Sequence, residues 1–428
     1  MKQRCILSFL LLVFITGQAM AQNRVIVRDT LGQNALNSVC LLLHCTVREG
    51  LDDGEGSLFL VTSNGGTLQS LLENLTSQLG VVSAEPDQVL KVKQTSAPSG
   101  LFDTTPVTYY GTSVWDGYAN QPAVSIVNLP STQSTYNVTG SGIVAIIDTG
   151  VDPTHPVLQG VLLDGWDFTR NQAVGSELVD TNQSTMAVVN GASPVLVNQS
   201  TMAVVNSTGS SVFTQSQFAA FGHGTMTAGI VHLVAPTAQI MPLKAFHSDG
   251  TANLCDVIRA VYYAIHHSAN VLSMSFDFTS SSPEMAQAIN TAASNNIITV
   301  ASAGNDGQAV VVYPAGLSNV MGVASTTNSD TLSTFSNYGQ PPVWVGAPGE
   351  GIISPYPYGT YAAGWGTSFS APFVAGTAAL LRSMDASVNQ SSASAAISNA
   401  FYISPDVGYG RLDIYQAVTS WCVTTHHC

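Results

Sequence analysis

Downstream of residue 142, short apolar runs alternate with longer segments in which apolar residues recur at helical spacing. The runs predict strands, and the segments between them predict helices. Strands that alternate with helices build parallel sheets covered by helices on both faces, so we expect an α/β fold. The expected strands are residues 143–147, 240–243, 271–275, 297–301, 320–324 and 343–345, and the expected helices lie near 256–268, 283–294 and 368–384.

Residues 22–94 carry a different pattern. Residues 24–29 and 57–62 predict strands, residues 67–79 have the apolar spacing of a helix, and residues 89–92 alternate again. This mixture indicates a small α+β unit ahead of the larger fold.

The first 21 residues have the pattern of a secretory signal. Lys2 and Arg4 precede an apolar run over residues 6–15, and Ala19-Met20-Ala21 supplies the small residues of a cleavage site. An apolar core this short does not span about 30 Å of hydrocarbon, and no later segment is long and apolar enough. We therefore expect a secreted protein without a membrane anchor.

Charge is sparse and mostly negative. The formal net charge is −14, and residues 95–428 hold five basic side chains against eighteen acidic ones. Binding of nucleic acid or of an anionic membrane needs clustered Lys and Arg, so the composition argues against both partners. An acidic surface that keeps the protein soluble is the simpler interpretation.

Five cysteines follow the signal segment, at positions 40, 45, 255, 422 and 428. Export favours disulfides, and the short spacings predict the pairs Cys40–Cys45 and Cys422–Cys428. Zinc ligation by the C-terminal Cys and His residues is the alternative, which so short a loop disfavours. Cys255 is left over, and we expect a small buried apolar side chain there rather than a reactive thiol at a helix start.

Three short glycine-flanked segments offer the side chains of a nucleophilic hydrolase. They contain Asp148 before Thr-Gly, His223 between two glycines, and Ser368 after Gly-Thr. Amide hydrolysis needs a nucleophile, a base that takes its proton and a group that orients the base. Asp148 follows an apolar strand, where open α/β sheets carry their sites, and Ser368 precedes a helix whose N-terminus favours negative charge.

The order Asp, His, Ser in these surroundings resembles the subtilisin-like serine proteases, or subtilases, from about residue 142 to about residue 418. The resemblance implies a subtilisin-like parallel sheet and an endopeptidase with Ser368 as nucleophile, His223 as general base and Asp148 as the group that orients it. It also implies that the side-chain amide of Asn305 joins the backbone N–H of Ser368 in binding the oxyanion. Residues 22–94 are similar to the inhibitor-type propeptides of this family.

The resemblance extends to substrate binding. Two segments match those that pair with the peptide as β-strands in the family, and a third group would shape a primary pocket that is mostly apolar. The first segment is Gly250, Thr251 and Ala252, the second is Ser275, Phe276 and Asp277, and the pocket group is Ser302, Ala303, Gly304 and Val312.

The chain departs from the family pattern at two important positions. Asp277 stands where relatives usually have Gly, which puts the rim of the primary pocket in question. Val157 stands where many bacterial relatives have an Asp that helps to bind calcium, and the loop that completes that site is missing. We therefore expect no cofactor and no metal site; calcium elsewhere stays open, because no motif locates it.

An internal repeat lies between Asp148 and His223. Residues 182–190 and 198–206 are identical, and two copies are too few for a repeat architecture. We expect a surface insertion, such as a hairpin of Met-Ala-Val-Val strands; a flap that grips the substrate is the alternative.

These features predict a secreted serine endopeptidase made as a self-inhibited precursor. The expected divisions are a signal peptide (1–21), an inhibitor-like prodomain (22–94), a linker and mature N-terminal segment (95–141) and a catalytic domain (142–428). We expect a monomer that cuts polypeptide substrates and is blocked by its own prodomain. Two alternatives stay open: a catalytically silent binding protein on the same scaffold, and an acyl transferase that uses the same acyl-enzyme.

Overall fold

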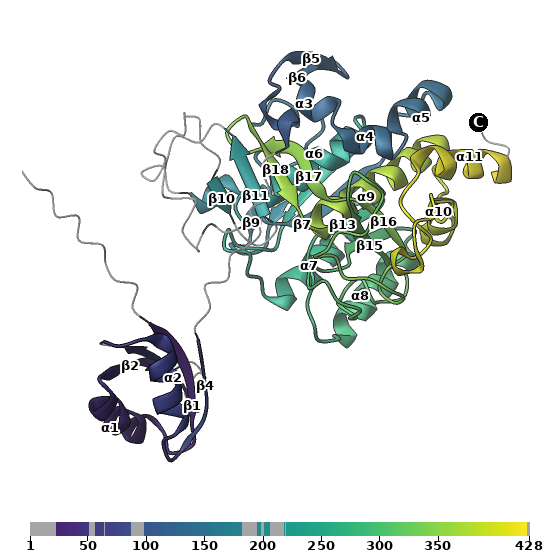
Figure 1. Ribbon diagram of the computed structural model, residues 1–428. Helices are drawn as coiled ribbons and strands as arrows, with labels where there is room; N and C mark the ends of the chain where they lie inside the picture. The colour runs from purple at the N-terminus through teal and green to yellow at the C-terminus, as the bar shows by residue number, and fades with distance from the viewer. Residues whose placement is uncertain are drawn as a thin grey trace, which may run out of the picture. The chain divides into compact units, whose positions relative to one another are not determined.

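The computed structural model describes residues 23–50, 56–63, 65–86, 98–181, 195–197, 201–205, 218 and 220–425. The chain divides into two compact units, Met1–Thr95 and Ser96–Cys428 (Figure 1). Among the described residues, no helix has the length and apolar character needed to cross a membrane.

The first unit is an antiparallel sheet with two helices on one face. Val25 and Val27 of β1 share a core with Leu36 of α1 and with Leu71 and Leu75 of α2. Alternate strand residues point to the same side, so both helices pack on that face, and the predicted α+β unit is confirmed. In the sheet order β2-β3-β1-β4, the elements are β1 Arg24–Asp29, α1 Gln33–Leu43, β2 Cys45–Gly50, β3 Leu58–Ser63, α2 Leu68–Thr76 and β4 Val81–Pro86.

The sequence pattern predicts only part of this unit. β1, β3 and α2 lie within a few residues of their expected bounds, but α1, β2 and β4 have no counterpart in the prediction. Leu41 and Leu42 in the last turn of α1 are 79% and 77% exposed, so apolar residues there do not mark a buried face. The expected strand at 89–92 lies outside the described residues.

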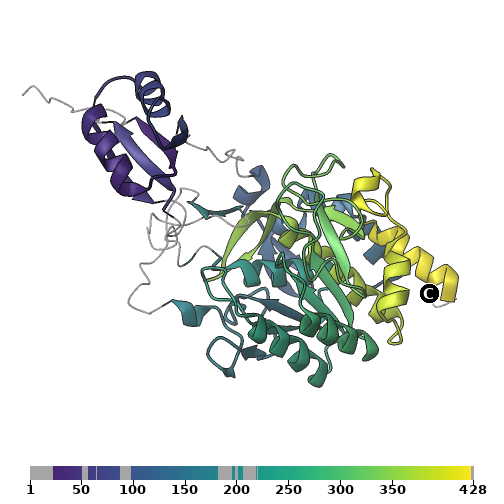
Figure 2. The ribbon, with the colours of Figure 1, turned by 90° about the horizontal axis from the view of Figure 1, so that it is seen from below.

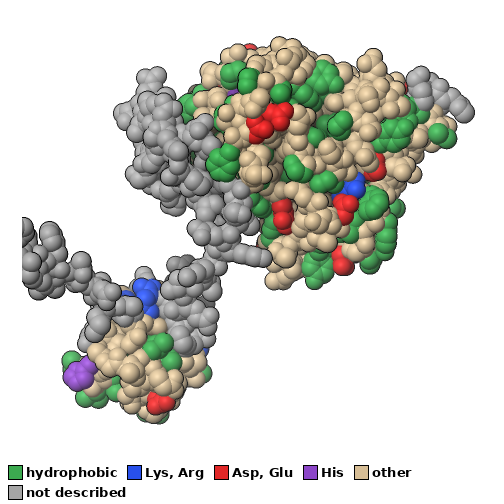
Figure 3. Space-filling view, turned by 45° about the horizontal axis from the view of Figure 1, so that its top comes forward, with side chains coloured by type: hydrophobic (Ala, Val, Ile, Leu, Met, Phe, Trp, Pro, Cys, Tyr) green, Lys and Arg blue, Asp and Glu red, His purple; other side chains and the backbone are tan. Residues whose placement is uncertain are grey.

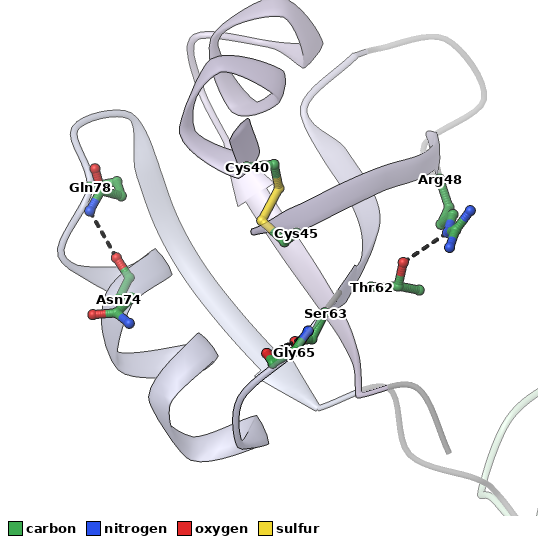
Figure 4. Close-up of a disulfide and its surroundings, with 8 residues drawn as sticks. All are labelled: Cys40, Cys45, Arg48, Thr62, Ser63, Gly65, Asn74 and Gln78. Atoms are coloured by element: carbon green, nitrogen blue, oxygen red, sulfur yellow. Dashed lines mark hydrogen bonds between the residues drawn. A yellow bond between two sulfur atoms is a disulfide. The ribbon is translucent and has the colours of Figure 1, made fainter. Parts of the chain in front are cut away.

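A disulfide joins Cys40 at the end of α1 to Cys45 at the start of β2, as predicted (Figure 4). Both cysteines are buried in the core of the first unit. The second predicted pair includes Cys428, which lies outside the described residues.

The second unit is built on an eight-stranded sheet in the order β16-β15-β14-β13-β7-β12-β8-β9. Every pairing from β16 to β8 is parallel, and β9 is antiparallel to β8. The six predicted strands are all found within a few residues of their expected positions. The strands are β7 Ile143–Asp148, β8 Trp166–Asp167, β9 Gln172–Ala173, β12 Gln239–Lys244, β13 Val271–Met274, β14 Ile298–Ser302, β15 Met321–Thr326 and β16 Val345–Pro348.

Alternate residues of the central strand β7 face two different cores. Val144 and Ile146 lie in the core that contains α6 and α9, whereas Ala145 and Ile147 lie in the core that contains α7 and α8. Helices therefore cover both faces of the sheet, as Figures 1 and 2 show, and the predicted α/β fold is confirmed. The helices are α6 His223–Val234, α7 Leu254–His266, α8 Pro283–Ser294 and α9 Thr367–Met384.

Residues 98–141, expected as a linker and mature N-terminal segment, contribute to the same core as α6. Leu101, Val114 and Tyr118 are buried in it, and the Tyr118 hydroxyl donates to the carbonyl of Gly229 at 2.7 Å. The smaller elements of the unit are η1 Ser99–Phe102, β5 Pro106–Tyr109, β6 Thr112–Trp115, α3 Asp116–Ala119, α4 Pro122–Ile126, α5 Leu129–Tyr136, η2 Leu178–Asp180, α10 Gln390–Ile397, η5 Pro405–Val407 and α11 Ile414–Thr425.

The internal repeat contributes to a separate antiparallel sheet in the order β10-β11-β18-β17. Its strands are β10 Val195–Val197, β11 Thr201–Val205, β17 Glu350–Tyr356 and β18 Thr360–Trp365. A hairpin is therefore present, but only β11 comes from a Met-Ala-Val-Val segment. β10 precedes the second copy of the repeat, and the first copy lies outside the described residues.

The prediction that Cys255 is buried is wrong, because its side chain is exposed. The residue lies in the first turn of α7, whose buried face consists of Val257, Ala260, Val261 and Ala264, together with Asp256. Cys255 does not belong to that face.

Charge on the second unit is scattered. On the face that Figure 3 shows, small acidic groups are separated by uncharged surface and predominate over basic side chains. This view agrees with the acidic composition.

Among the described residues of the second unit, the cations Lys244 and Arg411 are nevertheless buried. Lys244 at the end of β12 is fully buried, and its ammonium donates at 2.7 Å to each of three acceptors: the carbonyls of Thr149 and Phe246 and the carboxylate of Asp180. Arg170 pairs with the other oxygen of Asp180 at 2.5 Å. This buried network connects the ends of β7 and β12.

We expect Lys244→Met to lower the free energy of unfolding of the second unit by about 3–5 kcal/mol. Asp180 keeps only the partly exposed Arg170 as a partner, and the carbonyls of Thr149 and Phe246 lose their buried donor. Arg259→Met is the matched control: Arg259 pairs with Asp256 through a side chain that is 47% exposed, and such pairs contribute about 0–1 kcal/mol. Tryptophan fluorescence in urea titrations reports on this unit, which holds all five tryptophans. Equal losses in the two variants would contradict the prediction.

Candidate active site

β7 ends at Asp148, at the carboxyl edge of the parallel sheet. The residue is 4% exposed, and two donors besides His223 hold its side chain. The Thr149 N–H donates to its Oδ1 at 2.7 Å, and the hydroxyl of Thr227 in α6 donates to Oδ2 at 3.1 Å. These bonds fix the plane of the carboxylate.

His223 is the first residue of α6. The preceding Gly222 has a φ of 87°, a left-handed conformation that glycine adopts without strain. Nδ1 of His223 lies 2.7 Å from Oδ1 of Asp148. An ionised carboxylate can only accept, so Nδ1 carries a proton and Nε2 is left as an acceptor.

Ser368 is the second residue of α9, next to Phe369, whose ring centroid lies 5.5 Å from that of His223. Its hydroxyl donates to the carbonyl of Ser275 at 3.1 Å, and the Ser275 hydroxyl donates back to the Ser368 carbonyl at 2.8 Å. The start of α9 is thereby attached to the end of β13 and lies beside the imidazole.

Asn305 follows β14 and contacts the residue before Ser368. Its Oδ1 accepts the Thr367 N–H at 2.8 Å and the Thr367 hydroxyl at 3.1 Å. Since this oxygen is held by two donors, the amide orientation is set, and the Nδ2 donors point away from Thr367. Sequence reasoning gave no role to Thr367, whose only signal is its position before Ser368.

The predicted substrate segments follow two strands of the sheet. Gly250, Thr251 and Ala252 lie between β12 and α7, and Ser275, Phe276 and Asp277 follow β13. The segments lie close together: Phe246, which precedes the first, has its ring centroid 4.9 Å from that of Phe276.

The predicted pocket residues lie beside the second segment. The Ser302 hydroxyl donates to the Phe276 carbonyl at 3.3 Å, and Ala303 and Val312 are buried. Gly304 donates its N–H to the Thr367 hydroxyl at 3.2 Å, which connects this group to the start of α9.

Asp277 has a charged neighbour that the sequence prediction did not include. Desolvation and, to a smaller extent, the carboxylate of Asp306 raise the pKa of Asp277. This desolvation is partial, because the residue as a whole is exposed at the surface. Asp306 is held by Asn337, whose Nδ2 donates to it at 3.0 Å.

The described residues include no group of three or more His, Cys, Asp or Glu side chains placed to hold a metal ion. Val157, which replaces the calcium-binding Asp of many relatives, is 3% exposed and packs in the core with α6. An apolar side chain offers no ligand, so the residue does not fit that calcium site.

The comparisons with known proteins agree with this architecture. The model of the subtilase family matches residues 140–413. Thermitase from Thermoactinomyces vulgaris is 37% identical over 294 residues, which cover 65% of this chain and 89% of thermitase. A thermophilic serine proteinase from Bacillus sp. (strain AK1) is 32% identical over 285 residues, which cover 64% of this chain and 61% of that protein.

Solved structures show the same fold. A protease structure from Pseudoalteromonas arctica PAMC 21717 aligns with a TM-score of 0.55 and 26% identity, covering 69% of this chain and 94% of that one. A lanthipeptide protease aligns with a TM-score of 0.55 and 22% identity, covering 70% and 95%. With a family match over most of the chain and close sequence relatives, this protein belongs to the subtilase family and is a serine endopeptidase.

Proposed function

We propose that this subtilase is secreted as a self-inhibited precursor and that it cleaves polypeptides through Asp148, His223 and Ser368, with Asn305 as an oxyanion donor. One observation carries the assignment: His223 donates through Nδ1 to Asp148 at 2.7 Å, beside the first helix turn of α9, which contains Ser368.

The chemistry follows from this arrangement. The Ser368 Oγ attacks the carbonyl carbon of the substrate while Nε2 of His223 takes the hydroxyl proton. The tetrahedral oxyanion accepts hydrogen bonds from the Ser368 N–H, at the positive end of α9, and from the Asn305 amide. When the intermediate collapses, the imidazolium gives its proton to the leaving amine. Water then repeats the sequence on the acyl-enzyme and regenerates Ser368.

Asp148 stabilises the imidazolium that forms in each step. Its carboxylate is almost fully buried, so the attraction is less screened than it would be in water. It also keeps the proton on Nδ1, which leaves Nε2 free to act as the base.

Substrate binding would use main-chain pairing. As in the family that the chain resembles, the segments at 250–252 and 275–277 would pair with the two sides of a peptide, and such pairing tolerates many side chains. Ser302, Ala303, Gly304 and Val312 would then form the primary pocket, and the two buried apolar side chains among them favour an apolar residue before the cut bond.

The precursor assignment rests on the N-terminal part of the chain. We assign residues 1–21 to a signal peptide, 22–94 to an inhibitory prodomain, 95–141 to a linker and mature N-terminal segment, and 142–428 to the catalytic domain. The separate α+β core of the first unit supports a prodomain that folds as a unit. We assign the mature enzyme as a monomer outside the cell.

Self-processing tests the nucleophile. We expect Ser368→Ala to leave the precursor uncut in a host that lacks other proteases, because no nucleophile remains to cleave the prodomain. Ser370→Ala is the control. Ser370 lies in the same helix turn as Ser368, but its hydroxyl donates to the Pro348 carbonyl and should not be needed for cleavage. N-terminal sequencing distinguishes precursor from product, and normal maturation of the Ser368 variant would overturn the assignment.

Peptide-library profiling tests the specificity. We expect an apolar preference at the residue before the cut bond, because burying an apolar side chain contributes about 1.5–3 kcal/mol. The exposed Asp277 carboxylate contributes at most about 1 kcal/mol, or about fivefold in rate, toward a basic residue. Asp277→Gly should therefore change the profile only slightly, and Asp103→Ala, an exposed carboxylate outside these segments, should not change it. A dominant Arg or Lys preference that Asp277→Gly abolishes would contradict the ranking.

A further inference from the structure

A fully buried carboxylate lies next to the proposed triad although no motif contains it. Glu177 directly precedes η2 and is 0% exposed. Its Oε2 accepts the Gly222 N–H at 2.7 Å and the hydroxyl of Thr149 at 3.2 Å. Its Oε1 accepts the hydroxyl of Thr225.

Each of these partners adjoins a triad residue or belongs to its helix. Thr149 follows Asp148, and Gly222 precedes His223. Thr149 also links the two, since its hydroxyl oxygen accepts the N–H of Gly224, the residue after His223, at 3.0 Å. Glu177 therefore joins the end of β7 to the start of α6 through three hydrogen bonds.

The start of α6 needs such a partner. Helix N-termini leave backbone N–H groups unsatisfied, and a side chain at the N-cap usually accepts one of them. Here the N-cap is Gly222, which has no side chain to do so. The Thr149 hydroxyl supplies that acceptor to the N–H of Gly224. Glu177 holds this hydroxyl and also accepts the N–H of Gly222 itself, at the positive end of the helix dipole.

We propose that Glu177 is a positioning residue of the catalytic triad, capping the helix that carries His223 and fastening it to the strand end that carries Asp148. The proposal rests on the roles assigned above to these two residues. Glu177 does not touch the substrate; it acts through the hydrogen bond between Nδ1 of His223 and Oδ1 of Asp148.

The ionisation of Glu177 makes this positioning role measurable in the pH dependence of kcat. Desolvation raises the pKa of Glu177 to about 8. Hydrogen bonds from Thr225 and Gly222 and the positive charge of Lys244 lower this pKa, whereas the negative charge of Asp148 raises it further. The phenol groups of Tyr356 and Tyr358 also face it, and the Glu177 charge contributes to the raised pKa of each.

Ionisation changes what Glu177 can hold. Below about pH 8 the carboxyl keeps its proton, and that proton must occupy one of its two threonine contacts. Above this pH the carboxylate accepts from both threonines as well as from Gly222, so the start of α6 is held more firmly. The new negative charge also favours the imidazolium that forms at His223 in the transition state. We therefore expect kcat to rise through an inflection near pH 8.

The test compares mature wild-type enzyme with Glu177→Gln and with Asp413→Asn. In Glu177→Gln we expect kcat to fall by about tenfold to a hundredfold with KM unchanged, because a displaced base affects the transition state, and the inflection near pH 8 to disappear. Asp413 is a suitable control: it is a buried carboxylate that accepts the Gln416 N–H at 3.0 Å at the start of α11. Its variant should keep both kcat and the pH profile of the wild type.

A second variant keeps the test decisive if Glu177→Gln does not fold. Thr225→Val removes a donor to the ionised carboxylate, so the inflection should move to higher pH. An inflection that does not move in Thr225→Val, or that persists in Glu177→Gln, would overturn the proposal. So would an equal loss of kcat in Glu177→Gln and Asp413→Asn. The activity of Ser368→Ala, measured alongside, separates the two claims. If Ser368→Ala keeps its activity, the proposed function is overturned. If Ser368→Ala loses its activity while Glu177→Gln has the kcat and pH profile of the wild type, only the role of Glu177 is overturned.

Discussion

The close backbone contact between Gly150 and Gly224 is the constraint on which the site geometry depends. A Cβ atom on Gly224 would lie 2.0 Å from the carbonyl oxygen of Gly150, so any side chain would push the start of α6 away from the end of β7. Only at this separation can Nδ1 of His223 approach Asp148 to 2.7 Å. Hydrogen bonds weaken steeply when the donor–acceptor distance grows or the angle bends. Gly150 and Gly224, which carry no reactive side chain, therefore determine whether the imidazole of His223 is oriented.

The parallel sheet brings the remaining groups to the same place. β14, β13 and β7 are neighbours, and Asn305, Ser275 and Asp148 respectively lie at or just beyond their carboxyl ends. Because parallel strands end on one edge, residues far apart in the sequence meet there. The helices α6 and α9 begin at this edge, with His223 and Ser368 in their first turns, so their positive ends face the position where negative charge would develop.

Much of this arrangement could be predicted from the sequence, because it depends on local signals. Apolar runs mark strands that are buried on both faces, and each proposed triad residue adjoins a strand end or a helix start. α1 could not be predicted in the same way, since its exposed Leu41 and Leu42 obscure the buried face. The exposure of Cys255 was missed because it depends on which face of α7 packs against the sheet.

The buried charges could not be located from sequence for a different reason. Glu177 lies between the repeat and the motif of Asp148, in a segment without strong periodicity, and its partners become neighbours only in the folded chain. Lys244 gives a weak signal, as a lysine that ends an apolar strand, but its three acceptors come from three separate segments. Polar networks that join distant segments are specified by the tertiary fold and leave little trace in local patterns.

The central claim is that Ser368 is a nucleophile activated by His223. A fluorophosphonate probe reacts covalently with such a serine, and peptide mass spectrometry locates the modified residue. The account predicts one labelled residue, Ser368, with labelling lost in His223→Ala although Ser368 remains. Labelling of another serine, or equal labelling of Ser368 without His223, would contradict it.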